Sequence, residues 1–386
     1  MIYKYSTVVR LRSNRKGLTP RTLPFMMKKK HTGDNMLKQD QFVTPLLAWY
    51  DKNKREMVWR DRENAYYTWI SEIMLQQTRI EAAKDYFVRF TEELPDIRSL
   101  ANVPQERLLK LWEGLGYYNR AKNLQKTAKI LVEQYGAELP ADYEKLLALP
   151  GIGPYTAGAI ASIAYGIKVP AVDGNVLRVM MRYQASLEDI SKISVRRRVE
   201  GELTDVMPER PGDFNQAIME LGEVVCIPNG TPLCDRCPLA ATCEAKQKGE
   251  PEQYPRKIEK KPRKIEKKTI LIFEKEGMLG IAKRENKGLL AGLYEFPSFD
   301  GYFNKKELEE KLAGKGIIVK KIQPLGAAKH IFSHIEWHMK GYLIELPSSG
   351  KQPELLFASL EEVEDTYSLP TAFRAYREKM IKILNK

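Results

Sequence analysis

The cysteines constrain this chain more than any other residue type. All four lie within 18 residues, at Cys226, Cys234, Cys237 and Cys243, and the remaining 368 residues contain none. A secreted protein held together by disulfides distributes its cysteines along the chain. A C-x7-C-x2-C-x5-C spacing on proline-rich turns instead brings four thiolates to one centre. We therefore predict a loop that holds one metal centre, and the spacing alone accepts tetrahedral zinc and a four-iron cluster alike.

Length and charge indicate a multidomain protein with a polyanionic partner. A chain of 386 residues, 43% of them hydrophobic, is long enough for two domains or more. No apolar run approaches the roughly 20 residues of a membrane-spanning helix, so we expect no membrane partner. The formal net charge of +13 points toward nucleic acid, the usual polyanion.

The first 35 residues have the composition of a basic extension. No acidic residue precedes Asp34, and arginines and lysines recur without helical periodicity. We expect a disordered basic arm, or a protein whose translation begins at a later methionine such as Met36. The alternative is a mitochondrial presequence, which is also rich in arginine and poor in acids.

Residues 36–244 have the pattern of an all-α domain. Apolar residues recur at helical spacing from Phe42 to about Glu244, and short turns with glycine or proline separate the segments. The clearest predicted helices cover residues 45–50, 67–74, 106–112, 121–135, 155–165 and 215–225.

Residues 245–268 have the composition of a solvated linker. Pro255–Lys261 and Pro262–Lys268 repeat the same basic heptapeptide, and one heptad pair without an apolar stripe does not make a coiled coil. From Thr269 the apolar period changes to two, which predicts an α+β domain over 269–386. Its expected elements are a hairpin over 269–282, strands over 317–322 and 336–346, and helices over 305–312 and 372–384.

A glycine turn and a carboxylate precede the cysteine loop. The segment 149–155 reads as a helix end, a tight turn and a new helix start. Gly151 and Gly153 would expose bare N–H groups there, which suits a phosphate, although a plain helix–turn–helix corner would have the same pattern. Asp173 follows 20 residues after Gly153, and by itself it could equally be a helix N-cap. Turn, acid and four-cysteine loop in this order are hard to obtain by chance.

Five segments carry a resemblance to a known family. They are Val58–Arg60, Ser71–Thr78, Trp112–Tyr118, Pro170–Val176 and Phe332–His334. From Phe42 to Lys386 the chain resembles the helix-hairpin-helix DNA glycosylases of the endonuclease III superfamily, and within it the MutY-type adenine DNA glycosylases. The resemblance implies an all-α helix-hairpin-helix glycosylase domain with an iron–sulfur loop at 226–243, joined to an α+β Nudix-like domain that recognises 8-oxoguanine.

The same resemblance implies an activity and a cofactor. The expected enzyme removes adenine mispaired with 8-oxoguanine or guanine from duplex DNA, as a step of base excision repair, and holds a [4Fe-4S] cluster on the four cysteines. One departure is that seven residues, rather than the family's six, separate Cys226 from Cys234, which puts the shape of that loop in doubt. We expect a monomer in the bacterial cytoplasm, associated with the nucleoid.

Cleavage of the N-glycosidic bond explains the acidic residues. Removing adenine builds positive charge on the sugar and negative charge on the base, so an acid must protonate the purine and a carboxylate must stabilise the sugar. By resemblance Glu72 is the acid toward adenine N7 and Asp173 is the carboxylate, while Tyr155 and Asn175 steady the site. To act near neutral pH, Glu72 needs a raised pKa. We expect this from a desolvating pocket lined by Trp59, Ile73 and Leu75.

Other residues match positions that contact DNA in the family. A buried adenine must leave the base stack, which costs a few kcal/mol and leaves a hole. Gln77 and Tyr117 resemble the residues that fill and wedge the duplex, although Tyr117 could instead be a core aromatic. The remaining matches are Trp59, Arg60 and Gln216 around the extruded adenine, Thr78 and Leu115 near 8-oxoguanine, and Ser333 and His334 as its readers.

Residue 155 separates two kinds of glycosylase. Bifunctional relatives carry a lysine after the hairpin, whose amine forms a Schiff base with the sugar and permits strand cleavage. This chain has Tyr155 there, which implies base removal alone. The rival interpretations are a bifunctional endonuclease III-like glycosylase/lyase and a non-catalytic, zinc-stabilised binder of damaged DNA. The presence of both Glu72 and Asp173 argues against the second rival.

Three histidines invite a further zinc hypothesis. His330, His334 and His338 recur every four residues, as on one face of a helix. The neighbouring apolar residues alternate with polar ones, however, as in a strand. We therefore predict a strand there rather than a metal site.

Overall fold

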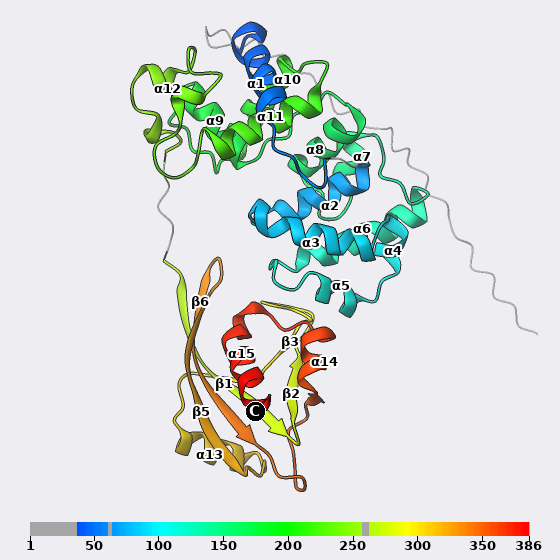
Figure 1. The fold of residues 1–386 in the computed structure, drawn as a ribbon, viewed down its shortest axis with the longest axis vertical. Helices are drawn as coiled ribbons and strands as arrows, with labels where there is room; N and C mark the ends of the chain where they lie inside the picture. Colours follow the sequence, from blue (N-terminus) through cyan, green and yellow to red (C-terminus); the bar gives the residue numbers. More distant parts are fainter. Residues whose placement is uncertain (1–36, 61–63, 257–261, 386) are drawn as a thin grey trace, which may run out of the picture. The chain divides into compact units, whose positions relative to one another are not determined.

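The computed structural model describes residues 37–60, 64–256 and 262–385. The chain separates into residues 1–36 and a second unit, Leu37–Lys386, and our expectations for the N-terminal extension lie outside the described residues. Within Leu37–Lys386 the predicted fold class is confirmed: an all-α domain is followed by a domain built on a mixed sheet (Figure 1). No described helix is long and apolar enough to cross a membrane.

The helices of the first domain match the predicted segments closely and add several shorter ones. In the described residues they are α1 (Thr44–Asn53), α2 (Ala65–Leu75), α3 (Ile80–Glu93), α4 (Ile97–Asn102), α5 (Gln105–Leu111), α6 (Asn119–Gln134), α7 (Tyr143–Leu147), α8 (Pro154–Tyr165), α9 (Gly174–Tyr183), α10 (Ile193–Asp205), α11 (Pro211–Val224) and α12 (Glu244–Gln247). A π-helical turn, η1 (Gln39–Val43), precedes α1.

Local sequence sets several helix starts. The Asn64 side chain accepts a hydrogen bond of 2.8 Å from the Tyr66 N–H and begins α2. Asp96 and Ser99 form a capping box at α4. Such side chains satisfy backbone donors that have no partner inside the helix. A left-handed glycine, Gly166, then ends α8.

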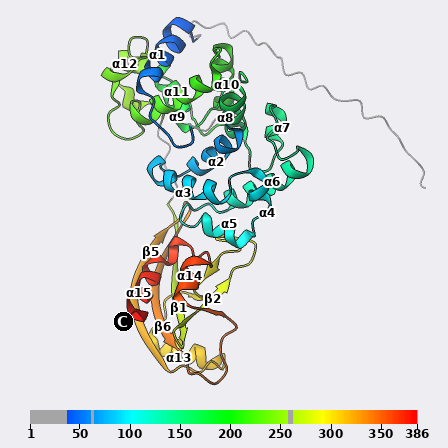
Figure 2. The same ribbon diagram turned by 45° about the vertical axis from the view of Figure 1, so that its right-hand side comes forward.

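Two apolar cores divide the helical domain. One gathers residues from Met57 to Ala161 on α2 to α8. The other joins η1 and α1 to α9, α10 and α11, together with Cys226 and Cys237 of the cysteine loop. α2 and α8 lie side by side in both views (Figures 1 and 2). The elements that carry Glu72, Tyr155 and Asp173 therefore meet where the two cores adjoin.

The glycine turn adopts the predicted helix–turn–helix shape between α7 and α8. Gly151 has a φ of +77°, and a Cβ there would lie 2.6 Å from the Asn123 Cβ, so only glycine fits. The Thr127 hydroxyl donates to the Pro150 carbonyl over 2.7 Å and fixes the turn against α6. Farther along α8, a Cβ on Gly158 would lie 2.3 Å from the Pro170 carbonyl oxygen. This close approach brings the segment before Asp173 against α8.

The second domain is a mixed sheet with helices on both faces. In the described residues the strands are β1 (Lys264–Lys275), β2 (Met278–Lys283), β3 (Tyr294–Glu295), β4 (Ser298–Asp300), β5 (Lys321–Ile331), β6 (Ile335–Glu345) and β7 (Leu356–Ala358), and the helices are α13 (Lys305–Gly314), α14 (Leu360–Asp365) and α15 (Arg374–Leu384). The main path runs β3-β2-β1-β6-β5, with β1 parallel to β6. One face packs on α14 and α15, and the other packs on α13.

Two predictions for this domain need correction. The predicted linker ends too late, because β1 already begins at Lys264, where residues 264–268 pair with 335–339 of β6. The strand predicted over 317–322 begins only at Lys321 and runs on to Ile331. For β1 the hydrogen-bonding partner lies 71 residues farther along the chain, so the local pattern could not reveal where the strand begins. β5 pairs with the next strand through a hairpin, and its bounds follow from that pairing, which runs from Lys321–Glu345 to Ile331–Glu336. The hairpin over 269–282 is confirmed, with Glu276 and Gly277 at its turn.

Candidate active site

A single cleft collects most of the residues that the sequence singled out. It has a volume of about 1500 Å³ and runs between the two cores of the helical domain. Both carboxylates, Glu72 and Asp173, line it. The other predicted residues along its wall are Trp59, Arg60, Gln77, Thr78, Tyr155, Asn175 and Gln216.

Glu72 is a buried acid with a raised pKa. It lies near the end of α2 and is 8% exposed. The Tyr155 hydroxyl donates a hydrogen bond to Glu72 Oε2 and lies 3.3 Å from the Met219 sulfur. Burial raises the pKa of Glu72 to about 7, the Tyr155 hydrogen bond opposes this rise, and the negative charge of Asp173 adds to it. Near neutral pH this carboxyl group can therefore hold a proton and release it.

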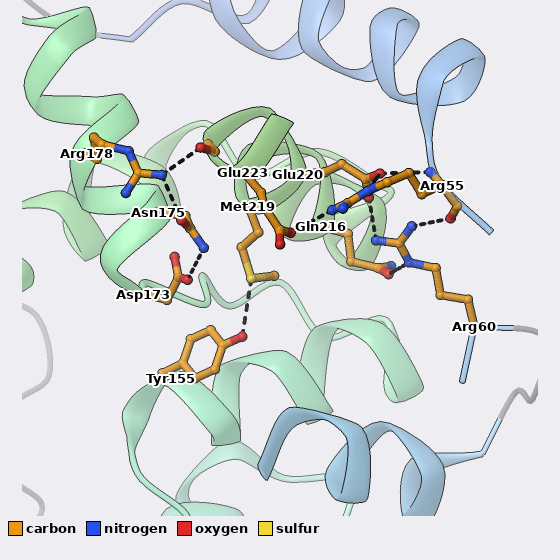
Figure 3. Close-up of polar contacts among 11 residues, drawn as sticks. Arg55, Arg60, Tyr155, Asp173, Asn175, Arg178, Gln216, Met219, Glu220 and Glu223 are labelled. Atoms are coloured by element: carbon orange, nitrogen blue, oxygen red, sulfur yellow. Dashed lines mark hydrogen bonds and ion pairs between the residues drawn. The ribbon is translucent and has the colours of Figure 1, made fainter. Parts of the chain in front are cut away.

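Asp173 serves both as a helix cap and as a cleft residue. Its Oδ1 accepts from the Val176 N–H over 2.8 Å at the start of α9. Its Oδ2 accepts from Asn175 Nδ2 over 2.8 Å (Figure 3). Burial raises the pKa of Asp173, while these N–H donors and the Arg178 charge favour its ionised form. The N-cap alternative is thus confirmed, and the cap fixes the carboxylate in the wall of the cleft.

Arg178 joins this carboxylate to the cysteine loop. Its Nη2 donates to Asn175 Oδ1 over 2.8 Å and to the Gly222 carbonyl over 2.6 Å (Figure 3). Its Nε donates to the Cys226 carbonyl over 2.9 Å. The side chain is only 8% exposed. Asp173, Asn175 and Arg178 therefore form one hydrogen-bonded chain along α9 that ends at the first cysteine.

A second polar network faces the cleft from α11. Arg60 donates to Gln216 Oε1 over 2.8 Å and to Glu220 Oε2 over 2.7 Å (Figure 3). Arg55 donates from Nε to Glu220 Oε1 over 2.9 Å and pairs with Glu223 over 2.6 Å. Burial would raise the pKa of Glu220, but the Arg55 N–H and the Arg60 charge outweigh it and lower that pKa. The network holds Arg60 and Gln216 in fixed positions along the wall.

Two of the predicted residues lie in the first core and do not line the cleft. Trp59 and Leu75 line the cleft, but Ile73 is 3% exposed inside the first core. Leu115, expected near 8-oxoguanine, is also buried in that core, with 7% exposure. The helix phase of α2 and the packing of the loop after α5 turn both side chains inward. The prediction that burial raises the pKa of Glu72 is therefore confirmed. The prediction that Ile73 lines the cleft is wrong.

The proposed wedge residues are at the surface. Tyr117 is 53% exposed, whereas its neighbour Tyr118 is 7% exposed and packs in the core. The core-aromatic alternative thus applies to Tyr118 and not to Tyr117. Gln77 is exposed, and Thr78 is half-buried beside it. At the glycine turn, Gly151 is exposed and Gly153 is half-buried.

Ser333 and His334 form the tip of a hairpin in the second domain. They connect β5 to β6, both side chains are exposed, and Ser333 Oγ lies 3.2 Å from His334 Nδ1. Phe332 anchors the tip, because its ring packs edge-on against Trp337 with centroids 4.9 Å apart. His330 and His338 lie on β5 and β6, as the strand interpretation predicts.

The four cysteines line one small cavity between α9, α11 and α12. Arg182 Nη1 lies 3.3 Å from Cys226 Sγ and also donates to the Ile227 carbonyl over 2.9 Å. Burial raises the pKa of the Cys237 thiol to about 12, and it raises those of Cys234 and Cys243 as well. A cationic centre is therefore needed to favour the thiolates. Four sulfur donors around one cavity fit a thiolate-bound metal centre.

Two further observations concern metal binding. The four cysteines line a common cavity, but in the described part of the chain no group of three or more His, Cys, Asp or Glu side chains, these cysteines included, is already arranged to hold a metal ion. The extra residue of the first cysteine interval falls in a loop where Gly230 has a φ of +77°. A left-handed glycine can absorb one residue as a turn without moving the flanking cysteines.

Sequence reasoning missed four residues of the site: Arg55, Arg178, Met219 and Glu220. Helical spacing from a predicted site residue could have indicated two of them, Arg178 and Glu220. Glu220 follows Gln216 by four residues and Arg178 follows Asn175 by three, so each lies on the same helix face as a predicted site residue. No local signal marks Arg55 or Met219.

Comparison with known proteins gives consistent matches for both domains. Residues 70–204 match the HhH-GPD superfamily of base excision DNA repair proteins, and residues 269–379 match the NUDIX domain. The adenine DNA glycosylase of Rattus norvegicus is 35% identical over 87% of this chain and 78% of its own length. That of Buchnera aphidicola from Acyrthosiphon pisum is 36% identical over 79% of this chain and 87% of its own.

A solved structure supports the helical domain. A thermostable thymine-DNA glycosylase is 26% identical, with a TM-score of 0.50, and the match covers 54% of this chain and 97% of that one.

Proposed function

The chain belongs to the adenine DNA glycosylase family, and on that premise we propose that it hydrolyses the N-glycosidic bond of adenine paired with 8-oxoguanine or guanine in duplex DNA. One observation carries this proposal. Two carboxyl groups with different environments face one cleft: Glu72 is desolvated to a pKa of about 7, and Asp173 accepts N–H donors on both oxygens. This is the pairing of acid and carboxylate that glycosidic cleavage requires.

The chemistry follows from the geometry. An adenine extruded into the cleft would receive the Glu72 proton at N7, so that the electron pair of the C1′–N9 bond leaves with a neutral base. Asp173 would stabilise the positive charge on the sugar until water adds at C1′ and loses a proton, which leaves an abasic site. Tyr155 holds Glu72 in place, and Asn175 holds Asp173.

A panel of opposite bases tests the substrate. Single-turnover excision from otherwise identical duplexes with adenine opposite 8-oxoguanine, guanine or thymine should be fastest for 8-oxoguanine and slowest for thymine. Equal rates on all three would contradict the proposed specificity. Undetectable excision from every duplex would contradict the activity itself.

We also propose a [4Fe-4S] cluster on the four cysteines. The common cavity and the all-sulfur donor set support a thiolate-bound centre, and the family resemblance favours iron over zinc. Purified protein should be brown, with broad absorbance near about 400 nm and about four irons per chain. Cys237→Ser should lose iron and colour. A colourless, fully active protein that contains zinc would refute the cluster.

Base removal should proceed without strand cleavage. Tyr155 cannot form a Schiff base, and Lys168 is paired with Glu209 over 2.5 Å and does not line the cleft. Borohydride added during turnover should therefore trap little covalent enzyme–DNA adduct. Lys54, which does line the cleft, provides the control: any faint adduct should disappear in Lys54→Ala. A stoichiometric adduct in wild type would revive the bifunctional alternative.

Preference for 8-oxoguanine should depend on the exposed hairpin tip. A serine hydroxyl both donates and accepts, which suits a purine with a hydrogen on N7 and an oxygen on C8. Ser333→Ala combined with His334→Ala should weaken the preference for 8-oxoguanine over guanine by about 1–3 kcal/mol in single-turnover rates. Ser348→Ala, at an exposed serine of the same domain, is the matched control. If the double variant still discriminates between 8-oxoguanine and guanine as wild type does, Ser333 and His334 do not recognise 8-oxoguanine.

We further propose that the protein works as a monomer in the bacterial cytoplasm, at the nucleoid. The net charge of +13 favours DNA as the partner.

A further inference from the structure

Gln77, in the wall of the cleft, and Tyr117, in the loop before α6, both have a backbone conformation that their side chains disfavour. Gln77 has a φ of +61° and Tyr117 a φ of +47°. Left-handed φ values are uncommon outside glycine and persist only where the surrounding structure enforces them. Gln77 lies two residues beyond the end of α2, and Tyr117 lies two residues before the start of α6. Both side chains are exposed.

A single arginine ties these two loops together. The Arg120 guanidinium, on the first turn of α6, donates to five backbone carbonyls on two segments. From Nη1 it reaches the carbonyls of Ile73 at 2.7 Å, Met74 at 3.0 Å and Gln76 at 2.6 Å, and from Nη2 those of Leu115 at 3.0 Å and Gly116 at 3.1 Å. The accepting groups immediately precede Gln77 on one side and Tyr117 on the other.

The hydrogen bonds to these five carbonyls are the main interactions of the Arg120 guanidinium. No carboxylate among the described residues pairs with it, and its Nε has no hydrogen-bond partner there. The guanidinium lies over the rings of Trp112 and Tyr117, 5.2 and 5.8 Å from their centroids. A cation is favourable at the C-terminal end of α2, where carbonyls lack helical partners. The positive charge of Arg120 therefore stabilises the carbonyl groups before Gln77 and Tyr117 and is not paired with a described carboxylate.

We propose that Arg120 is a positioning residue that presets Gln77 and Tyr117 for entry into the duplex. The inference rests on the proposed function, in which these two side chains replace and wedge the bases around the extruded adenine. Without the five bonds, both loops would relax toward ordinary φ values, and the two side chains would no longer project together. The planar fork of arginine can reach carbonyls on two segments at once, whereas a lysine ammonium is a point charge on a flexible stem.

The same bonds link base extrusion to the proton donor. Two of the accepting carbonyls, those of Ile73 and Met74, directly follow Glu72 on α2. A shift of the wedge loop would therefore be transmitted to the helix end that carries the acid. Removing Arg120 should slow extrusion first and chemistry second, and it should leave phosphate contacts elsewhere unchanged.

The test compares Arg120→Lys with wild-type protein on two duplexes of the same sequence, a cleavable one for excision and a non-cleavable one for extrusion. A 2-aminopurine placed beside the target adenine, opposite 8-oxoguanine, reports unstacking, and a non-cleavable 2′-fluoro adenosine stops the reaction at extrusion. We expect the unstacking rate and single-turnover excision to fall by roughly ten- to a hundredfold, as misplaced contacting groups do. Binding to undamaged duplex should stay within about twofold, because a lysine keeps the charge that phosphates attract.

Arg89→Lys is the matched control, since Arg89 is an exposed arginine of the same domain that lies over the Tyr86 ring, 4.7 Å from its centroid. It should leave unstacking and excision unchanged. Amide hydrogen exchange then shows whether the variant is merely poorly folded. In Arg120→Lys the exchange rate should rise only in the segments around Gln77 and Tyr117. Exchange that rises across all helices would show a general structural role and overturn the proposal.

The outcomes also separate this inference from the proposed function. Wild-type protein that fails to excise adenine would sink the proposed function. If wild-type protein excises adenine and Arg120→Lys unstacks the duplex equally fast, only the inference about Arg120 is contradicted.

Discussion

Replacing Asp173 by asparagine should abolish adenine release while sparing binding to the lesion duplex. In the proposed mechanism the Asp173 carboxylate stabilises charge that exists mainly in the transition state, so its loss should affect the chemical step. We attribute binding to phosphate contacts and to the proposed wedge residues, Gln77 and Tyr117, and the substitution changes none of these. We expect single-turnover excision to fall by about a thousandfold or more, with the dissociation constant for a duplex containing adenine opposite 8-oxoguanine changed little.

The dual role of Asp173 calls for a control of helix capping. Asparagine is also a good N-cap, so α9 should still form. With one acceptor oxygen, however, it can keep only one of the bonds to Val176 and Asn175. Asp142→Asn changes the cap of α7, which also accepts over 2.8 Å, at a site outside the cleft. Asp142→Asn should leave excision intact. If Asp173→Asn excised adenine at the wild-type rate, the Asp173 carboxylate would have no part in the mechanism.

Replacing Glu72 by glutamine should be similarly severe and should also remove a pH dependence. Burial raises the pKa of Glu72 to about 7, so the protonated acid predominates below pH 7 and is lost above it. Wild-type single-turnover rates should therefore fall as pH rises through about 7, roughly tenfold for each further pH unit. Glu72→Gln should be nearly inactive at every pH. A rate that rises with pH across this range would contradict a protonated Glu72.

Glu200 supplies the matched control for the pH profile. Burial raises the pKa of this α10 carboxyl group too, but it lies outside the cleft. Glu200→Gln should leave both the rate and its pH dependence unchanged. A profile altered by Glu200→Gln and not by Glu72→Gln would show that the titrating group had been misassigned.

The same pKa predicts an effect on stability. Because the folded pKa of Glu72 lies above the ordinary 4.5, the folded protein binds the proton more tightly than the unfolded chain does. Stability from this group is present below about pH 4.5 and is lost as pH rises to about 7. The loss above pH 7 is about 3 kcal/mol. Glu72→Gln should therefore unfold at a higher denaturant concentration than wild type at pH 8, with little difference at pH 4.5.

Much of the helical domain was predictable because its signals are local. Apolar spacing, the glycine turn and the cysteine spacing all lie within segments of about twenty residues, and helices form through contacts between near neighbours in sequence. The α+β class of the second domain was predictable for the same reason, since hairpin turns are local too. The start of β1 was not, because Lys264 pairs with Ile335 on a strand far along the chain.

The site shows the same division. Glu72, Asp173 and the four cysteines stand out by their surrounding sequence. The Arg60–Glu220 contact joins residues 160 positions apart, and no local pattern indicates it. Leu115 lies in a segment that resembles a DNA-contacting loop, yet its side chain packs into the core. Side-chain direction in an irregular loop depends on packing against distant elements, which a linear motif does not contain.

By itself, the sequence determined which chemical groups are available: two carboxylic acids at Glu72 and Asp173, a tyrosine where a lyase has lysine, and four thiols in one loop. Only the tertiary structure decided their state. The pKa of Glu72 depends on burial and on the nearby Tyr155 and Asp173, which come from other parts of the chain. The left-handed backbone at Gln77 and Tyr117 is held by Arg120, which joins the two loops. Covalent identity is local, whereas protonation and strain are set by neighbours that only folding brings together.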